Sequence, residues 1–287
     1  MDIMEPRIQI NDTLFDLIVV QRGGATAVYK SGNEILRIGD RAKITKDLAL
    51  HKKMEALGFP VARLLGEGES GGFGYFIESS LGERHLGNQF AEDVRESGVI
   101  RDASFQSLLE IAARFGRAQL KSIVPAHNFE EFAHGIHLDI LCEELPDYAA
   151  AIQSRFRRCI ERFAPFPFVI THGDFNPNNL YPEGVIDLED SFYGPFGFDL
   201  VTALVHINYS PDSPEYEYVA RYRFTPAQSR EYLEVIDSIA TGAHLPRLSE
   251  FKDDFEFCRA AWSLVRMHKW PKLRQFRYDL FMQKFLV

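Results

Sequence analysis

Residues 171–180 read THGDFNPNNL, and residues 184–189 read GVIDLE. Each segment borders a short apolar stretch, FVI at 168–170 and VI at 185–186, that is typical of a buried strand. Polar groups at such places are costly to bury unless they bind one another or a ligand. We therefore predict that the chemistry of this chain is centred on these two segments.

The acidic and amide side chains of the two segments suit phosphoryl transfer. Asp174 and Asn179 lie five residues apart, and Asp187 follows eight residues after Asn179. Phosphoryl transfer needs a carboxylate for the acceptor hydroxyl and oxygen ligands for Mg²⁺. No cysteine or histidine pair stands with these residues, which disfavours zinc. Two carboxylates and one amide oxygen therefore point to Mg²⁺ and phosphate chemistry.

The pattern His-Gly-Asp-x-x-x-x-Asn followed by Ile-Asp resembles the aminoglycoside phosphotransferase and choline kinase superfamily, which is related to the protein kinases. The resemblance implies that Asp174 is the catalytic base and that Asn179 and Asp187 are metal ligands. It places His172 beside the base, as a residue that shapes the catalytic loop. It also implies that Asp199 braces this loop from the start of a helix.

The N-terminal part agrees with this family. Gly23, Gly24 and Thr26 form a turn where the family folds a backbone loop over the phosphates, and glycine permits that close approach. Arg37 stands where the family presents a lysine to the α and β phosphates, and it offers a planar, permanently charged fork instead. The resemblance implies that Asp47, shorter than the usual Glu, holds Arg37 from the next helix. Without the catalytic loop, Arg37 and Asp47 would be interpreted as surface charges.

The segment from Ile77 to Glu83 resembles the hinge between the two lobes of such enzymes. Glu78 and Ser80 lie within it, and the resemblance implies that its backbone amide and carbonyl groups bind the adenine edge. The implied substrates and cofactors are thus ATP and Mg²⁺.

Hydrophobic periodicity predicts an α+β chain, with a small antiparallel sheet and one helix in residues 1–80 and mainly helices in residues 81–287. The resemblance implies a bilobal, protein-kinase-like fold, in which residues 1–80 form the nucleotide-binding lobe and residues 81–287 the catalytic and substrate-binding lobe. The expected strands are Phe15–Val20, Thr26–Lys30, Glu34–Ile38, Val61–Leu65, Tyr75–Glu78, Phe168–Ile170 and Val185–Ile186. The expected helices are Ile44–Leu57, Ser104–Ile123, one or two between residues 138 and 163, and residues 226–241 and 250–270.

The composition of the chain bears on its cellular location and on the kinds of partner it can bind. The net charge of −9 disfavours nucleic-acid binding. No stretch approaches the length of a membrane span, the first residues lack an apolar signal region, and the 3 cysteines are scattered. We expect a cytoplasmic protein without a membrane partner. Its oligomeric state stays open.

The acceptor is expected to be a hydroxyl of a small molecule: an aminoglycoside, choline or ethanolamine, homoserine, or a sugar-like compound. Segment 122–154 is rich in acids and would attract a cationic acceptor, although a solvated helical face explains it as well. Glu189 and Asp190 could orient substrate or metal, or face solvent. Whether GTP can replace ATP stays open.

Two other functions compete with the small-molecule kinase. A protein kinase would place Arg where Gly173 stands, and would carry an Ala-Pro-Glu motif after a long activation segment, which this sequence lacks. A pseudokinase would bind nucleotide without catalysis, but the base and both metal-ligand positions are intact.

Overall fold

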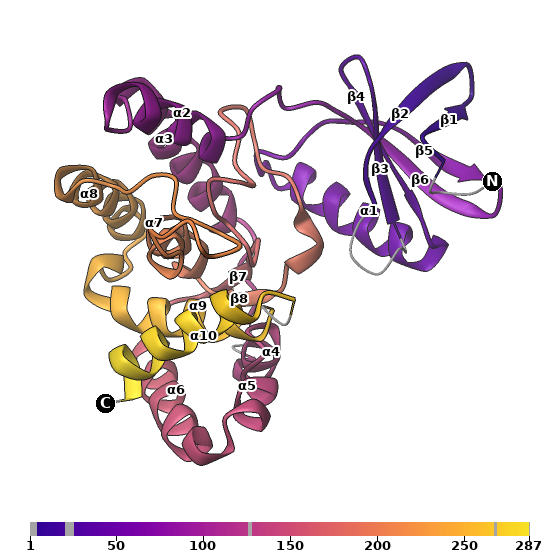
Figure 1. Cartoon of the computed structure of the whole chain (residues 1–287). Coiled ribbons are helices and arrows are strands. Elements are labelled where there is room, and N and C mark those ends of the chain that lie inside the picture. Colours follow the sequence, from indigo (N-terminus) through magenta and orange to yellow (C-terminus); the bar gives the residue numbers. More distant parts are fainter. Residues whose placement is uncertain (1–4, 21–25, 126–127, 267–268, 287) are drawn as a thin grey trace. The chain divides into compact units, whose positions relative to one another are not determined.

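The computed structural model describes most of the chain, namely residues 5–20, 26–125, 128–266 and 269–286. The chain divides into two compact units (Figure 1). The first unit comprises Met1–Arg84 and Tyr181–Glu189, and the second comprises His85–Leu180 and Asp190–Val287.

Residues 181–189 return from the second half of the sequence to pack with the first unit. The Val185 amide donates to the Pro60 carbonyl at 2.7 Å, and Val185 forms an isolated parallel bridge with Val61. Asp187 therefore belongs to the same compact unit as Arg37. The division predicted from the sequence, at about residue 80 with two continuous domains, stays a prediction.

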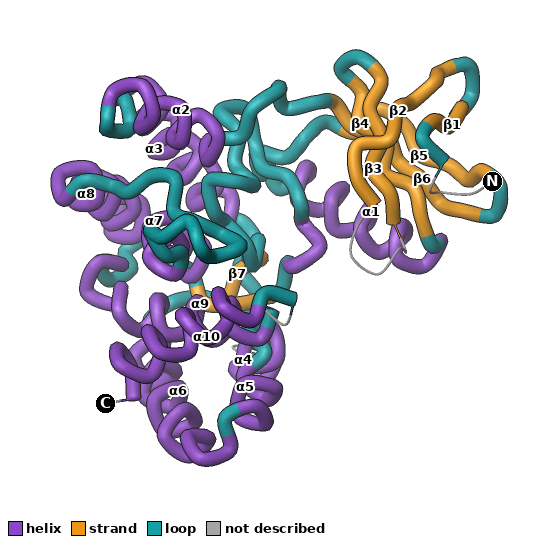
Figure 2. The backbone as a smooth tube through the Cα atoms, in the orientation of Figure 1, coloured by secondary structure: helices purple, strands orange, loops and turns teal. Residues whose placement is uncertain are grey.

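The first unit is built on a six-stranded antiparallel sheet in the order β1-β2-β3-β4-β6-β5 (orange in Figure 2). The strands are β1 Arg7–Ile10, β2 Thr13–Val20, β3 Thr26–Ser31, β4 Glu34–Gly39, β5 Leu64–Ser70 and β6 Phe73–Ser79. Alternating side chains of these strands form one apolar core, which includes Phe15, Tyr29, Leu36 and Ile38.

Helix α1, Arg41–Ala56, follows β4 directly and contacts β4 and β6. The Asp40 side chain begins the helix by accepting the Lys43 backbone amide at 3.0 Å. Because α1 starts only two residues after β4 ends, the side chains of its first turns lie near the end of that strand.

The second unit is mainly helical (purple in Figure 2). Its helices are α2 Leu86–Ser97, α3 Asp102–Gln119, α4 Phe129–Gly135, α5 Leu138–Glu144, α6 Ala149–Phe163, α7 Phe198–Val205, α8 Pro226–Gly242, α9 Lys252–Val265 and α10 Pro271–Phe281. Strands β7 Phe168–Ile170 and β8 Tyr193–Pro195 form a short antiparallel pair. Residues 171–180 lie between these two strands in the sequence. Among the described residues, no helix combines the length and apolarity needed to cross a membrane.

The expected fold class is confirmed: a small antiparallel sheet with one helix precedes a larger helical part. Some element predictions were wrong. β5 lies at Leu64–Ser70 rather than Val61–Leu65, because this polar, mostly exposed edge strand is held by pairing with β6 and carries little hydrophobic signal. Val185–Ile186 makes one bridge and no strand, and no prediction from the sequence covered β1, β8, α2, α4 or α10.

Candidate active site

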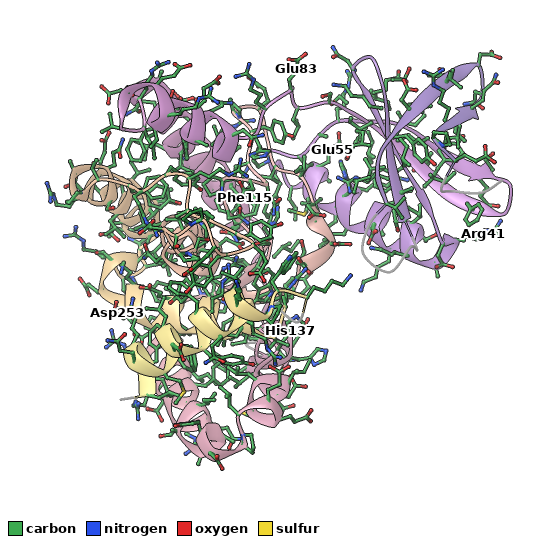
Figure 3. The ribbon with its side chains drawn as sticks, viewed as in Figure 1. Arg41, Glu55, Glu83, Phe115, His137 and Asp253 are labelled. Carbon is green, nitrogen blue, oxygen red and sulfur yellow. The ribbon has the colours of Figure 1, made fainter. Side chains whose placement is uncertain are left out.

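The loop 171–180 leaves the end of β7, which is fully buried, and is fixed at its start by Thr171. The Thr171 amide and hydroxyl both donate to the Phe192 carbonyl, each at 2.8 Å. Phe175 then packs against Phe115 of α3 with ring centroids 4.5 Å apart (Figure 3 labels Phe115). A backbone bond at one end and an aromatic anchor in the middle hold the loop in one conformation.

Asp199, in the first turn of α7, accepts hydrogen bonds that hold the loop in place. It accepts the His172 amide at 2.8 Å, the Gly173 amide at 3.1 Å and the Gln119 side-chain amide at 2.8 Å. Burial raises the pKa of this carboxyl to about 6, although the His172 imidazole and the N–H donors oppose the rise. The bracing role implied for Asp199 is visible in these contacts.

Gly173 adopts φ +80°, a conformation that favours glycine. A Cβ atom built there would lie 2.1 Å from the backbone oxygen of Asp190. This close approach gives a steric reason why glycine occupies the place where protein kinases have arginine.

The Asp174 carboxylate is held by three side chains. Oδ1 accepts from Asn176 at 2.8 Å and from Arg259 at 2.8 Å, while Oδ2 accepts from Asn179 at 3.2 Å. Burial by itself would raise the pKa of Asp174, but Arg259, then His172 and Asn176, outweigh it and bring the pKa below its ordinary value. Asp174 is therefore an oriented, ionised carboxylate.

His172 is fully buried, and its Nδ1 accepts the Asp174 amide at 3.3 Å. Its ring packs near those of Phe115 and Phe175, at 6.3 and 6.0 Å between centroids. His172 therefore contacts the loop around Asp174 and is not exposed, and its predicted role in shaping that loop stays a prediction.

Arg259 was not found by the sequence analysis, because it lies on α9, 85 residues beyond Asp174. It is almost completely buried, and its guanidinium carbon lies 4.0 Å from the ring centroid of Trp262. The signal available in the sequence was a lone charged residue in the run from Phe257 to Val265, whose other members are apolar except for Ser263. Such a charge, if buried, needs a partner.

In the first unit, Arg37 of β4 pairs with Glu78 of β6 rather than with Asp47. The Arg37 Nε donates to Glu78 Oε1 at 2.8 Å, and both side chains are nearly buried. Glu78 Oε2 also lies 3.4 Å from Nδ1 of His51 on α1. Burial lowers the pKa of Arg37, but Glu78, then Asp187 and Asp47, outweigh it and the pKa lies above its ordinary value.

The ion pair implied between Arg37 and Asp47 is therefore not formed in the described part of the chain. Asp47 Oδ2 instead accepts from Lys43 Nζ at 3.0 Å, one helical turn earlier, and Lys43 also reaches Glu189 at 3.3 Å. Asp47 is one methylene shorter than Glu, and the nearby Lys43 is within its reach. Lys43 is a second cation of this region that the sequence analysis missed.

One cavity of about 30 Å³ lies within the first unit. Its lining includes Arg37 and the acidic side chains of Asp47, Glu78, Asp187 and Glu189. A cavity of this size has room for a water molecule. Asp187 adopts φ +65°, which is uncommon for a residue other than glycine. The side chain of Arg37 thus shares this cavity with four acidic side chains.

The other residues predicted to bind the nucleotide are Gly23, Gly24, Thr26 and Ser80, and the structure describes only the last two. Gly23 and Gly24 lie outside the described residues. Thr26 is buried, and its hydroxyl has no hydrogen-bond partner in the described part of the chain. The Ser80 amide donates to the Asn33 carbonyl at 2.7 Å, so this N–H is already used within the sheet. The adenine contact predicted for the segment from Ile77 to Glu83 would therefore use other backbone groups than the Ser80 amide, and it stays a prediction.

The residues expected to bind Mg²⁺ have the right donor atoms. Asn179 uses its amide nitrogen on Asp174, which leaves its side-chain oxygen to bind a cation. Asp187 contributes a carboxylate to the cavity beside Arg37. Within the described residues no three His, Cys, Asp or Glu side chains form a closed metal cluster. Mg²⁺ does not need one, since it uses few carboxylates together with water and phosphate oxygens.

Comparison with known proteins agrees with this arrangement. The sequence model of the phosphotransferase enzyme family (APH) matches residues 21–232. No curated protein matches the chain significantly.

Solved structures of similar fold span nearly the whole chain. A thermostable mutant of aminoglycoside phosphotransferase APH(4)-Ia, in complex with ADP and hygromycin B, has a TM-score of 0.58 at 15% identity, covering 94% of each chain. The same enzyme with AMP-PNP and hygromycin B has a TM-score of 0.57 at 15% identity, covering 94% of this chain and 93% of that one. A choline/ethanolamine kinase family protein from Mesorhizobium loti has a TM-score of 0.57 at 15% identity, with coverage of 93% and 86%.

Proposed function

Because the chain belongs to the phosphotransferase enzyme family, we propose that it transfers the γ-phosphoryl group of ATP to a hydroxyl of a small molecule. Family membership confirms the expected enzyme class, a kinase or phosphotransferase with an alcohol group as acceptor. The observation that carries the finer proposal is the Asp174 carboxylate, fixed by three donors and ionised.

Asp174 would hold the acceptor hydroxyl through Oδ2. Oδ1 already accepts two hydrogen bonds, whereas Oδ2 accepts one, from Asn179. A carboxylate oxygen can accept two such bonds, so Oδ2 has room for the substrate O–H. The acceptor oxygen forms the new bond to phosphorus, the bond to the leaving ADP breaks, and the proton passes to Asp174. With a lowered pKa, Asp174 chiefly orients the hydroxyl and takes its proton late.

The first unit is proposed to bind the nucleotide. Arg37 offers a guanidinium beside Asp187, and the buried Thr26 hydroxyl lacks an acceptor that a phosphate oxygen would supply. Asn179 and Asp187 would hold Mg²⁺, which when bound neutralises charge on the phosphates. The ADP and AMP-PNP complexes of the similar aminoglycoside phosphotransferase support this choice of nucleotide.

The second unit is proposed to bind the acceptor, and the expected cytoplasmic location stays a prediction. The experiment is a panel of hydroxyl compounds incubated with Mg²⁺ and ATP, with both ADP and phosphorylated product measured. We expect product with at least one class, and near-complete loss of it in Asp174→Asn. Asp253→Asn, an exposed acid of α9, is the matched control and should retain full activity.

Nucleotide binding without product from any acceptor class would favour the pseudokinase alternative. Product formation that survives Asp174→Asn at the wild-type rate would contradict the role assigned to Asp174. Measuring product as well as ADP separates transfer from contaminating ATPase activity.

A further inference from the structure

The surroundings of Asp174 in the second unit carry more positive than negative charge. Arg259 of α9 and Arg277 of α10 both interact electrostatically with Asp174 and with each other. His206, in the turn after α7, is also close, and burial followed by Arg259 brings its pKa to about 3, so it is neutral. Arg266 and Asp190 also act on Arg259 but pair with each other, so the charges of two guanidinium groups act on the single carboxylate of Asp174.

Arg277 has hydrogen-bonding capacity to spare. Its Nε donates to the Tyr209 carbonyl at 2.8 Å, and it forms no ion pair with any described residue. Burial, followed by repulsion from Arg259, lowers its pKa to about 10, which still leaves it charged at neutral pH. A half-buried guanidinium with both terminal amino groups unused by the described chain is an expensive arrangement without an anion.

Two of the acids near these helices are already neutralised by other cations. Glu256 is bound by Lys252 and Lys284, at 3.1 and 2.6 Å. Glu144, from the acid-rich segment that suggested a cationic acceptor, is paired with Arg274 at 2.7 Å. These acids therefore leave the charge of Arg277 uncompensated.

The ring of Trp262, which could hold a cationic acceptor, is already covered by two other cations. The guanidinium carbons of Arg259 and Arg266 lie 4.0 and 4.4 Å from the Trp262 ring centroid. A quaternary ammonium would have to displace these charges before it could contact that ring.

We propose that the acceptor carries an anionic group, a carboxylate or a phosphate, near its reacting hydroxyl, and that Arg277 binds this group. The inference rests on the proposed function, since it takes Asp174 as the group that receives the hydroxyl. Arg259 keeps Asp174 oriented, and Arg277 selects the charge of the acceptor. A cationic acceptor would meet net repulsion here, whereas an anionic one would be attracted.

The test compares hydroxy acids with hydroxy amines by thermal unfolding. The probes are glycerate and 3-phosphoglycerate on one side, and ethanolamine and choline on the other, at equal ionic strength with chloride as the reference anion. We expect the anionic probes to raise the melting temperature of the wild type and the cationic probes to leave it unchanged. Arg277→Gln, which keeps a donor for the Tyr209 carbonyl, should weaken anion binding by about ten- to a hundredfold. Lys272→Gln, an exposed cation on the same helix, should have no effect.

A second arm distinguishes the acceptor from the nucleotide as the source of the anion. With saturating Mg²⁺ and AMP-PNP, the shift caused by the hydroxy acid should add to the nucleotide shift, and Arg277→Gln should leave the nucleotide shift intact. Absence of any nucleotide shift would count against the proposed function, not against the anion site.

Stabilisation by the amines only, by neither class of probe, or by hydroxy acids equally in wild type and Arg277→Gln would overturn the inference. Loss of AMP-PNP binding in Arg277→Gln would also overturn it, because Arg277 would then belong to the nucleotide.

Discussion

The ion pair between Arg37 and Glu78 allows a quantitative test of how the first unit is held together. The two charges lie 2.8 Å apart, with side chains 16% and 6% exposed. At an effective dielectric constant of about 20, their attraction is about 6 kcal/mol before the cost of desolvation. Removing one partner of such a pair strands a buried charge and typically costs about 3–5 kcal/mol. We expect a cost in this range for Arg37→Met.

The double variant Arg37→Met/Glu78→Leu should recover at least about 2 kcal/mol of that loss, since it leaves no buried charge unpaired. Arg7→Met is the matched control. Its ion pair with Asp16 has a similar length, 2.6 Å, but both side chains are about two-thirds exposed, so we expect at most about 1 kcal/mol.

Urea unfolding followed by two probes gives the free energies. Far-UV circular dichroism reports both units, whereas tryptophan fluorescence reports the second unit, because Trp262 and Trp270 are the chain's 2 tryptophans. A double variant as unstable as Arg37→Met, or a single variant as stable as the wild type, would refute the reasoning.

Three further predictions concern the catalytic loop. Gly173→Ala should cost about 2–5 kcal/mol in thermal or urea unfolding, because its Cβ would meet the Asp190 carbonyl at a positive φ. Arg259→Gln should move the acidic limb of the kcat–pH profile to higher pH, because the main group that lowers the pKa of Asp174 is lost; an unmoved limb would contradict this. Asp199 has a folded pKa of about 6, above its unfolded value, so its contribution to stability is full below about pH 4 and falls by about 3 kcal/mol as the pH rises through 6. Asp199→Asn cannot titrate, so the stability difference between wild type and variant should shrink over that range, as urea unfolding at several pH values would show.

The local parts of the site were predictable from the sequence. The loop 171–180 carries its own turn residues, and Asp174 and Asn179 meet because they are five residues apart in it. The strand that carries Arg37 could be placed because the turn signal Ser31-Gly32-Asn33 directly precedes it. In both cases the residues that decide the local structure are close together in the sequence.

The partners that the sequence analysis missed depend on register and on long-range packing. Glu78 meets Arg37 because β4 pairs with β6, with Arg37 opposite Phe76 and Glu78 two residues further along the same face. The resemblance implied that Asp47 pairs with Arg37, but Lys43 lies one helical turn before Asp47 and takes its carboxylate. The helical spacing could have indicated that pair, whereas the register of β4 against β6 is not encoded within one element.

The central claim is that this chain binds Mg²⁺ and ATP for phosphoryl transfer, and nucleotide-dependent stabilisation tests it most directly. Melting temperatures would be measured with AMP-PNP at millimolar concentration, with and without Mg²⁺. A ligand at about a hundred times its Kd stabilises the folded state by about 2.7 kcal/mol. Asp187→Ala should lose the Mg²⁺-dependent part of the shift, whereas Asp12→Ala, an exposed acid of the same unit, should keep it. We predict a clear Mg²⁺-dependent rise for the wild type; no rise, or an equal rise in Asp187→Ala, would contradict the account.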